Sequence, residues 1–275
     1  MIVRDVYARI AKLCRNRALL IASDFDGTLT PIVAKPESAP LAPSTVELLR
    51  ALTAMPGCTL MIVSGRSLSD LRSRVLVPAV LAGNHGLEIE GPGFSFRHEG
   101  AVELMEKLAE ASSTVAALLS GRPGAFVERK GLTATVHYRH ASEKYHHELV
   151  RTIRGCMGLY GTTFGLRSGK KALEIHPRLG WNKGTAVNWV RHRLKLNGAG
   201  CVCLGDDRTD ESMFRECEDA TTIAVGEPRR TSAEYLVRDH LAVLTLLTEI
   251  ERLLRLRTDI PGDSGLAEHR LAVGP

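Results

Sequence analysis

The sequence lacks any apolar run close to the ~20 residues that a membrane-spanning helix needs. The run from Ala18 to Ala22 follows Arg15 and Arg17, as in a signal peptide, but it is too short for that role. It leads directly into Asp24 and Asp26, so we expect a buried strand there. No membrane partner is predicted.

Cysteines, aromatic residues and net charge also exclude several classes of protein. The six cysteines show no metal-type spacing, and aromatic residues make up 5% of the chain. With no secretion signal, reduced thiols in a cytoplasmic protein are expected. The net charge of +5 includes no basic stripe interleaved with aromatics, which argues against a nucleic-acid partner and suits a small anionic substrate.

Short apolar, β-branched runs alternate with helical patterns in two parts of the chain. The predicted strands are residues 18–23, 59–63, 80–82, 200–204 and 221–225. The predicted helices are residues 46–54, 68–74, 184–196 and 211–218, the first opened by a capping box at residues 44–47. This rhythm predicts an α/β fold with a doubly wound, mostly parallel, Rossmann-like sheet that has helices on both faces.

Between these two parts the rhythm changes to αββαββ, which is typical of an antiparallel sheet with helices on one face. The predicted elements are a helix at 102–119, strands at 125–130 and 132–139, a helix at 143–157 and strands at 162–167 and 172–176. We therefore expect a core of residues 1–98 and 179–257, interrupted by a small α+β domain at 99–178. Residues 258–275 carry Pro, Gly and polar residues and are expected to form a loose tail.

Two carboxylates, Asp24 and Asp26, directly follow the first predicted strand, and Gly27 lets the chain turn sharply after them. Open α/β sheets bind their ligands at this end of the strands. Paired carboxylates suit magnesium, and one of them could also attack phosphorus while the other exchanges protons with the leaving oxygen. An acidic surface turn is the alternative, but the apolar strand in front favours a pocket.

Two polar groups follow at later helix starts and strand ends. Ser64-Gly65-Arg66 offers a hydroxyl and a backbone amide for phosphate oxygens, although Ser64 is as well suited to cap a helix. Lys183 lies beside a predicted helix start, where it could neutralise a phosphoryl group or be an ordinary solvated lysine.

An acidic run follows the strand at 200–204. Four carboxylates within residues 206–211 repel one another unless a cation lies among them. Asp210 and Glu211 also suit a helix N-terminus, but Asp206 and Asp207 precede that helix. A bound cation is the better explanation.

In this order the groups resemble the four motifs of the haloacid dehalogenase superfamily, namely DFDGT (24–28), SGR (64–66), Lys183 and GDDRTDE (205–211). The insertion resembles that superfamily's type C2B cap. Further matching segments are GNHGLE (83–88), ERK (128–130), HYR (137–139), LEIHP (173–177) and GWNKG (180–184). Together these motifs run through most of residues 20–230 and resemble trehalose-6-phosphate phosphatase.

The resemblance implies a magnesium-dependent enzyme that hydrolyses trehalose 6-phosphate through an aspartyl-phosphate, the last step of trehalose biosynthesis. Asp24 would be the nucleophile and a magnesium ligand, and Asp26 the general acid/base that gives the metal its backbone carbonyl. The other implied catalytic and metal-site residues are Lys183, Asp206, Asp207 and Asp210. The implied substrate-binding residues are Ser64, Gly65, Arg66, Asn84, His85, Glu128, Lys130, Arg139 and Glu174, of which Glu128, Lys130 and Glu174 would contact sugar hydroxyls. Functional pairing with a trehalose-phosphate synthase is also implied.

Three alternatives stay open at this point. The enzyme could instead be a phosphatase for sucrose phosphate or mannosyl-3-phosphoglycerate, or a phosphomannomutase, since sugar specificity rests on a few contacts. A pseudo-disaccharide phosphate could use the same cap. A sensor that binds the sugar phosphate without hydrolysing it would be expected to have lost one of Asp24, Asp26, Lys183 or Asp206, and all four are present.

Overall fold

The computed structural model describes residues 3–32, 41–169, 171–227 and 230–258. The chain divides into two compact units. Unit 1 consists of Met1–Phe96 and Asn182–Pro275, and unit 2 of Arg97–Trp181. The predicted tail at 258–275 lies, apart from Thr258, outside the described residues.

Unit 1 is built on an eight-stranded sheet with the order β12-β11-β10-β1-β2-β3-β4-β5. Its strands are β1 (Leu19–Ser23), β2 (Cys58–Val63), β3 (Val80–Gly83), β4 (Glu88–Gly91), β5 (Phe94–Arg97), β10 (Gly200–Gly205), β11 (Thr221–Val225) and β12 (Tyr235–Val237). Neighbours from β12 to β3 pair in parallel, and β3 pairs with β4 antiparallel. Every residue of β1, β10 and β11 is buried, as expected for strands covered on both faces. The predicted fold class is confirmed.

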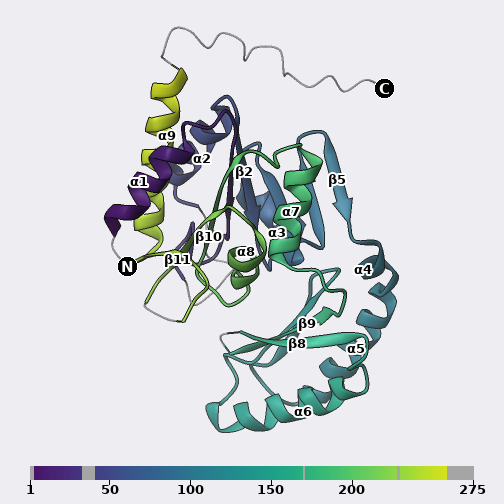
Figure 1. The fold of residues 1–275 in the computed structure, drawn as a ribbon. Helices are drawn as coiled ribbons and strands as arrows, with labels where there is room; N and C mark the ends of the chain where they lie inside the picture. The colour runs from purple at the N-terminus through teal and green to yellow at the C-terminus, as the bar shows by residue number, and fades with distance from the viewer. Residues whose placement is uncertain (1–2, 33–40, 170, 228–229, 259–275) are drawn as a thin grey trace. The chain divides into compact units, whose positions relative to one another are not determined.

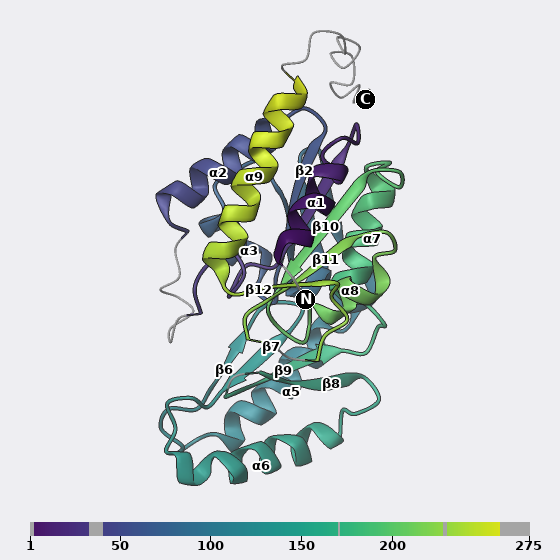
Figure 2. The same ribbon diagram turned by 60° about the vertical axis from the view of Figure 1, so that its left-hand side comes forward.

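Helices cover both faces of this sheet (Figures 1 and 2). They are α1 (Val3–Leu13), α2 (Pro43–Ala54), α3 (Leu68–Arg74), α7 (Lys183–Arg193), α8 (Glu211–Glu216) and α9 (His240–Thr258), with a 3₁₀ turn, η2, at Asn84–Gly86. Helices α1, α2, α3 and α9 pack apolar side chains against one face of β1, β2, β10 and β11 in a shared core. Figures 1 and 2 show α7 and α8 on the opposite face.

Helix α2 corrects one prediction from the sequence. It begins at Pro43 and its N-cap residue is Ala42, with no side-chain capping bond, so the predicted capping box at residues 44–47 is wrong. Ser44, the cap residue of that box, lies inside the first turn of α2. Pro43 supplies the helix start, because its ring fixes a helical φ and it has no N–H to satisfy.

Unit 2 carries a four-stranded antiparallel sheet with the order β6-β7-β9-β8. Its elements are α4 (Glu99–Glu103), α5 (Met105–Leu118), β6 (Phe126–Arg129), β7 (Ala134–His137), the 3₁₀ turn η3 (Glu143–Tyr145), α6 (His146–Gly158), β8 (Phe164–Gly169) and β9 (Ala172–Pro177). Helices α5 and α6 pack on one face of the sheet (Figure 1). The predicted order αββαββ is confirmed, but the helix predicted at 102–119 is broken at Leu104.

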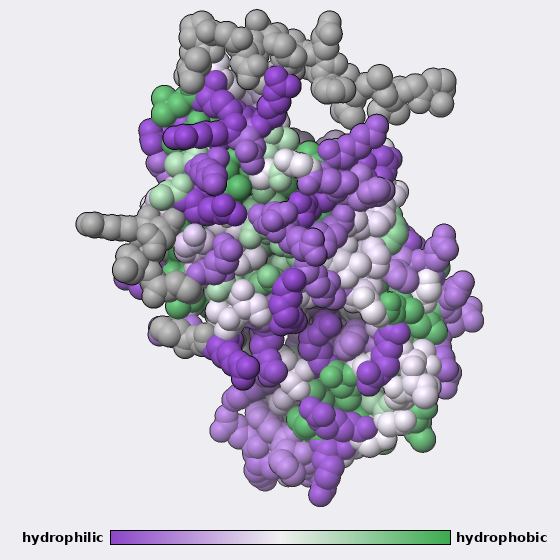
Figure 3. Space-filling view, in the orientation of Figure 1, coloured by the Kyte–Doolittle hydropathy of each residue, from purple (hydrophilic) through white to green (hydrophobic). Residues whose placement is uncertain are grey.

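The surface of the described residues is mostly hydrophilic on the side that Figure 3 shows. Its large exposed hydrophobic side chains are scattered through both units; they are Ile32, Leu76, Val102, Leu118, Phe126, Leu159, Leu241 and Leu256. Among the described helices, none is both long and apolar enough to span a bilayer.

Candidate active site

The strand order of unit 1 brings its predicted site residues to one edge of the sheet. Strands β10, β1, β2 and β3 are adjacent and parallel, so their carboxyl ends lie at the same edge. The residues just beyond these ends are Asp24 and Asp26 after β1, Ser64, Gly65 and Arg66 after β2, Asn84 and His85 after β3, and Asp206, Asp207 and Asp210 after β10. Lys183 joins them from the first turn of α7.

A buried ammonium group links two carboxylates at this edge. Lys183 Nζ donates to Asp24 Oδ1 at 2.6 Å and to Asp210 Oδ1 at 2.6 Å. The Lys183 side chain is only 2% exposed, which excludes the solvated lysine that the sequence left open. Helix α7 holds Lys183 in place because the Asn182 side chain caps it, accepting a hydrogen bond from the Thr185 amide at 3.0 Å.

The electrostatics of this cluster are set by burial and by the excess of carboxylates. Burial raises the pKa of Asp24 well above its usual range; Lys183 opposes this, and Asp210 and Asp206 raise the pKa further. Burial alone would lower the pKa of Lys183, but Asp210 and Asp24 outweigh it and the pKa is raised. Lys183 therefore stays an ammonium, and the cluster favours additional positive charge.

Asp206 lies directly over the turn that follows Asp24. Gly27 has φ +86°, and a Cβ atom there would lie 2.3 Å from Asp206 Oδ2. The turn is closed by the Gly27 amide, which donates to the Thr30 carbonyl at 2.9 Å. Glycine at position 27 thus permits both the left-handed backbone and the close approach of the carboxylate.

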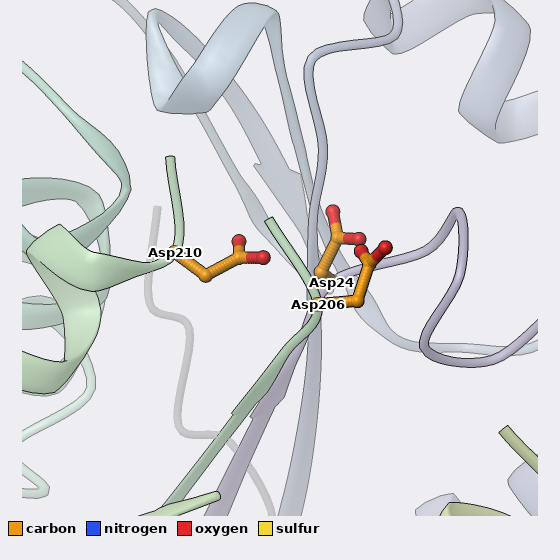
Figure 4. Close-up of side chains that lie close together, drawn as sticks. All are labelled: Asp24, Asp206 and Asp210. Atoms are coloured by element: carbon orange, nitrogen blue, oxygen red, sulfur yellow. The ribbon is translucent and has the colours of Figure 1, made fainter. Parts of the chain in front are cut away.

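The three buried or half-buried carboxylates can hold a cation. Asp24, Asp206 and Asp210 each offer an oxygen within 4.8 Å of the others, and in Figure 4 the Asp210 side chain points towards the other two. An all-oxygen set suits a hard divalent cation. Asp210 is already engaged, because Oδ1 accepts from Lys183 and Oδ2 accepts from the Asp207 amide at 2.9 Å. Asp207 itself is exposed.

The Asp26 side chain is not a member of that carboxylate cluster and binds Arg66. Arg66 Nε and Nη2 donate to the two carboxylate oxygens of Asp26, each at 2.6 Å, and Nη1 donates to Asp70 at 2.6 Å. Asp70 also accepts from Arg74 Nε at 2.9 Å. Burial alone would raise the pKa of Asp70, but the hydrogen bonds from Arg74 and Arg66 lower it below its ordinary value. The motifs did not identify Asp70, although its i, i+4 spacing from Arg66 and to Arg74 was a usable signal.

The ends of β2 and β3 are tied together by backbone hydrogen bonds. The His85 amide donates to the Ser64 carbonyl at 2.8 Å, and the Asn84 amide donates to the Arg66 carbonyl at 2.7 Å. Asn84 and His85 both have left-handed φ, +49° and +58°, which is uncommon for residues other than glycine. Gly65 makes room for the imidazole, because a Cβ atom there would lie 2.8 Å from the His85 ring.

Glu88 is a further residue that the motif roles did not include. Its Oε1 accepts from Asn84 Nδ2 at 2.8 Å and from the Leu68 amide at 2.8 Å. Glu88 therefore holds the strained Asn84 turn and the start of α3 together.

The predicted sugar-binding residues belong to unit 2. Glu128 and Glu174 lie opposite Thr135 in the strand register, on the same face of the sheet. Lys130 follows β6, and its amide donates to the Thr133 carbonyl at 2.9 Å. Arg139 lies in a turn after β7, beyond the paired residues.

A doubly wound parallel sheet with carboxylates and a buried lysine at its carboxyl edge is the arrangement of the haloacid dehalogenase class of proteins. A family model described as trehalose-phosphatase matches residues 22–236 of this chain. The chain belongs to the trehalose-phosphatase family, as its motifs predicted.

The chain is also similar to individual proteins that carry two different names. The chain is 37% identical over 219 residues to an uncharacterized glycosyl hydrolase of Mycobacterium tuberculosis, covering 76% of this chain and 16% of that protein. It is 37% identical over 199 residues to a trehalose-phosphate phosphatase of Mycobacterium avium, covering 70% of this chain and 49% of that protein. The chain thus spans about half or less of these curated relatives. A crystal structure of a trehalose-6-phosphate phosphatase related protein is similar, with a TM-score of 0.76 and 27% identity, covering 86% of this chain and 99% of that one.

Proposed function

We propose that this protein is a magnesium-dependent phosphatase that hydrolyses trehalose 6-phosphate to trehalose and phosphate, the last step of trehalose biosynthesis. The observation that carries the proposal is the buried contact of Lys183 with Asp24, beside Asp206, in a chain of the trehalose-phosphatase family. A carboxylate beside a buried ammonium and a cation site is suited to attack a dianionic phosphate.

In this proposal Asp24 is the nucleophile. Its carboxylate attacks phosphorus, an aspartyl-phosphate forms, and the sugar oxygen leaves with a proton from Asp26; Asp26 then takes a proton from the water that hydrolyses the intermediate. Lys183 stabilises charge on the phosphoryl oxygens, and Ser64, Gly65 and Arg66 bind them. Asn84 and His85, in unit 1, also contribute to substrate binding.

Magnesium fits the oxygen donors of Asp24 and Asp206, together with the backbone carbonyl of Asp26. When bound, it would neutralise phosphate charge that otherwise repels the nucleophile. Asp210 serves better as the anchor of Lys183, since both of its oxygens already accept hydrogen bonds. Asp207 supports this loop through its amide, which donates to Asp210.

Unit 2 is proposed to be the type C2B cap of residues 99–178, on a core of residues 1–98 and 179–257. Glu128, Lys130 and Glu174 then bind sugar hydroxyls, with Arg139 assisting. We further propose a cytoplasmic location, which the six free cysteines support, and functional pairing with a trehalose-phosphate synthase.

Phosphate release tests the proposal. Wild-type protein with magnesium should release phosphate from trehalose 6-phosphate much faster than from glucose 6-phosphate, sucrose 6-phosphate or mannosyl-3-phosphoglycerate. A chelator and Asp24→Asn should each abolish release, while Asp219→Asn, at an exposed position, should not. Turnover of another sugar phosphate would refute the substrate and keep the chemistry. A folded, magnesium-loaded protein that turns over none of the four would refute trehalose 6-phosphate as the substrate and favour a different sugar phosphate or a sensor.

A further inference from the structure

The sheet of unit 2 has one apolar face and one polar face. Ala134, Val136, Leu173 and Ile175 point to the apolar face, where they pack with α5 and α6. Side chains alternate along a strand, so the residues between them point to the other face. In the strand register Glu128 pairs with Thr135, Thr135 with Glu174, and Glu174 with Arg167. These residues form one row that crosses all four strands on the polar face.

Each carboxylate of this row is held by a neighbouring side chain. His137 Nε2 lies 2.7 Å from Glu128 Oε2, and Arg167 Nη1 donates to Glu174 Oε2 at 3.0 Å. The Glu174 side chain is only 12% exposed, so its carboxylate has little freedom to turn. A charge-assisted bond of this kind fixes the direction in which the second oxygen points.

Thr135 lies between Glu128 and Glu174 in this row, and unlike them it is uncharged. It is 6% exposed, and its Oγ1 has no hydrogen-bond partner among the described residues. A buried hydroxyl without a partner lowers stability, and native structures contain few of them. Such a group is explained when a ligand supplies the missing hydrogen bond.

We propose that Thr135 binds a sugar hydroxyl of the substrate, and that His137 and Arg167 position Glu128 and Glu174 to accept hydrogen bonds from neighbouring hydroxyls of the same sugar. The inference rests on the proposed function and extends it from three cap contacts to a continuous row. A sugar hydroxyl both donates and accepts, so one hydroxyl can donate to a carboxylate and accept from Thr135. Substrates that lack this hydroxyl leave the row unsatisfied and are discriminated against.

Thr135→Val tests the ligand role, because it removes the hydroxyl and keeps the shape. It should lower kcat/KM for trehalose 6-phosphate about tenfold, the worth of one lost hydrogen bond. Hydrolysis of p-nitrophenyl phosphate, which has no sugar, should stay unchanged. The melting temperature should stay the same or rise, since an unpartnered buried hydroxyl is replaced by a methyl group. Thr135→Ser should keep the wild-type kinetics.

Two results would overturn the ligand role. Equal losses on both substrates together with a lower melting temperature would mean that Thr135 is merely structural. Unchanged kinetics on trehalose 6-phosphate would mean that it does not touch the sugar. Wild-type protein inactive on trehalose 6-phosphate would instead refute the proposed function, and this inference with it.

Arg167→Gln tests the positioning role. It should raise KM for trehalose 6-phosphate about tenfold and leave p-nitrophenyl phosphate hydrolysis unchanged, because only the orientation of the Glu174 carboxylate changes. Arg154→Gln is the matched control. Arg154 donates to Ser168 at 3.2 Å. Ser168 follows Arg167 in the chain but does not belong to the row. Equal effects of the two substitutions, or none from Arg167→Gln, would refute the positioning role.

Discussion

The carboxyl edge of the unit 1 sheet and the polar face of the unit 2 sheet differ in the sequence separation and the burial of their charged pairs. At the edge, Lys183 and Asp24 are 159 residues apart in sequence, and both are buried. On the polar face, Arg167 and Glu174 are 7 residues apart and are direct cross-strand partners. The first arrangement depends on the whole fold, whereas the second depends on one antiparallel pairing.

This difference indicates what each region can tolerate. Buried charges are costly unless each has a partner, so the edge should be strongly destabilised when Lys183, which bonds to two of its carboxylates, is removed. Ion pairs that are partly exposed, as Arg167 is at 32% and Glu128 at 47%, contribute less to stability, so the polar face can change its contacts and hence its selectivity without unfolding. The proposed chemistry and the proposed sugar recognition thus lie in regions with different sensitivity to mutation.

The largest expected effect is on turnover. Asp24→Asn should reduce phosphate release by at least about 10³-fold, because the proposed nucleophile is lost. Stability should be kept or slightly raised, since burial already disfavours the charged form of Asp24. Glu174→Gln is the comparison from the other region and should lose activity on the sugar phosphate only. Phosphate release measures the activity of both variants, and thermal melting measures their stability. If both variants lost the same activity on every substrate, the two regions would not differ in function.

The next effect is on folding. Lys183→Met removes the ammonium that Asp24 and Asp210 share, leaving two buried carboxylates with no counter-charge, and should destabilise the protein by about 3–5 kcal/mol. Adding Asp210→Asn should recover part of that loss, which urea unfolding would detect. Lys12→Met, on the exposed surface of α1, is the control. A loss as small as that of the control would mean that the edge is not a coupled charge cluster.

The sequence predicted the strand ends that carry the site better than it predicted the burial and register of the surrounding residues. Strands β1, β2 and β10 each end where an apolar run meets a polar motif, so their positions followed from pattern alone. The burial of Lys183 did not, because it depends on strand order and on α7 packing against α8. Arg167 and Thr135 carry no local signal, since only the register aligns them with Glu174.

Several elements were not predicted from the sequence, and the causes differ. Helix α9 was not predicted, although its buried Val243, Leu246, Leu247, Ile250 and Leu254 follow a helical period that the sequence displays. The hairpin of β4 and β5 gave weaker signals, because each strand has only four residues and most of its side chains are partly exposed. The sequence therefore carries a clear helical pattern for α9 and only a weak strand pattern for the hairpin.

Divalent metal should stabilise the folded protein through the edge of the unit 1 sheet and not through the polar face of unit 2. Magnesium at about 100 times its dissociation constant should stabilise the wild-type protein by about 2.7 kcal/mol, because it binds the folded state. Asp206→Asn should abolish this stabilisation, as it removes an oxygen from the cluster at the edge. Glu174→Gln should leave it intact. Melting with and without magnesium after chelation would check this, and a magnesium response lost in Glu174→Gln would contradict the assignment of the metal to unit 1.

The smallest effect should come from Asp70, which belongs to the charge network at the edge of the unit 1 sheet. Its side chain is 32% exposed, the same fraction as that of Arg167 on the polar face. Arg74 and Arg66 lower its pKa below the ordinary 3.8, against the effect of burial. The unfolded chain therefore takes up the proton more readily than the folded one, so the stabilisation by ionised Asp70 is fully present above about pH 4 and is lost as the pH falls through the folded pKa. Asp70→Asn should destabilise the protein by about 1 kcal/mol near neutral pH, by progressively less as the pH falls below about 4, and by nothing once the pH is below the folded pKa. Urea unfolding across this range, beside Asp219→Asn, would measure it. A difference from wild type that persists in acid would mean that Asp70 acts through packing and not through its charge.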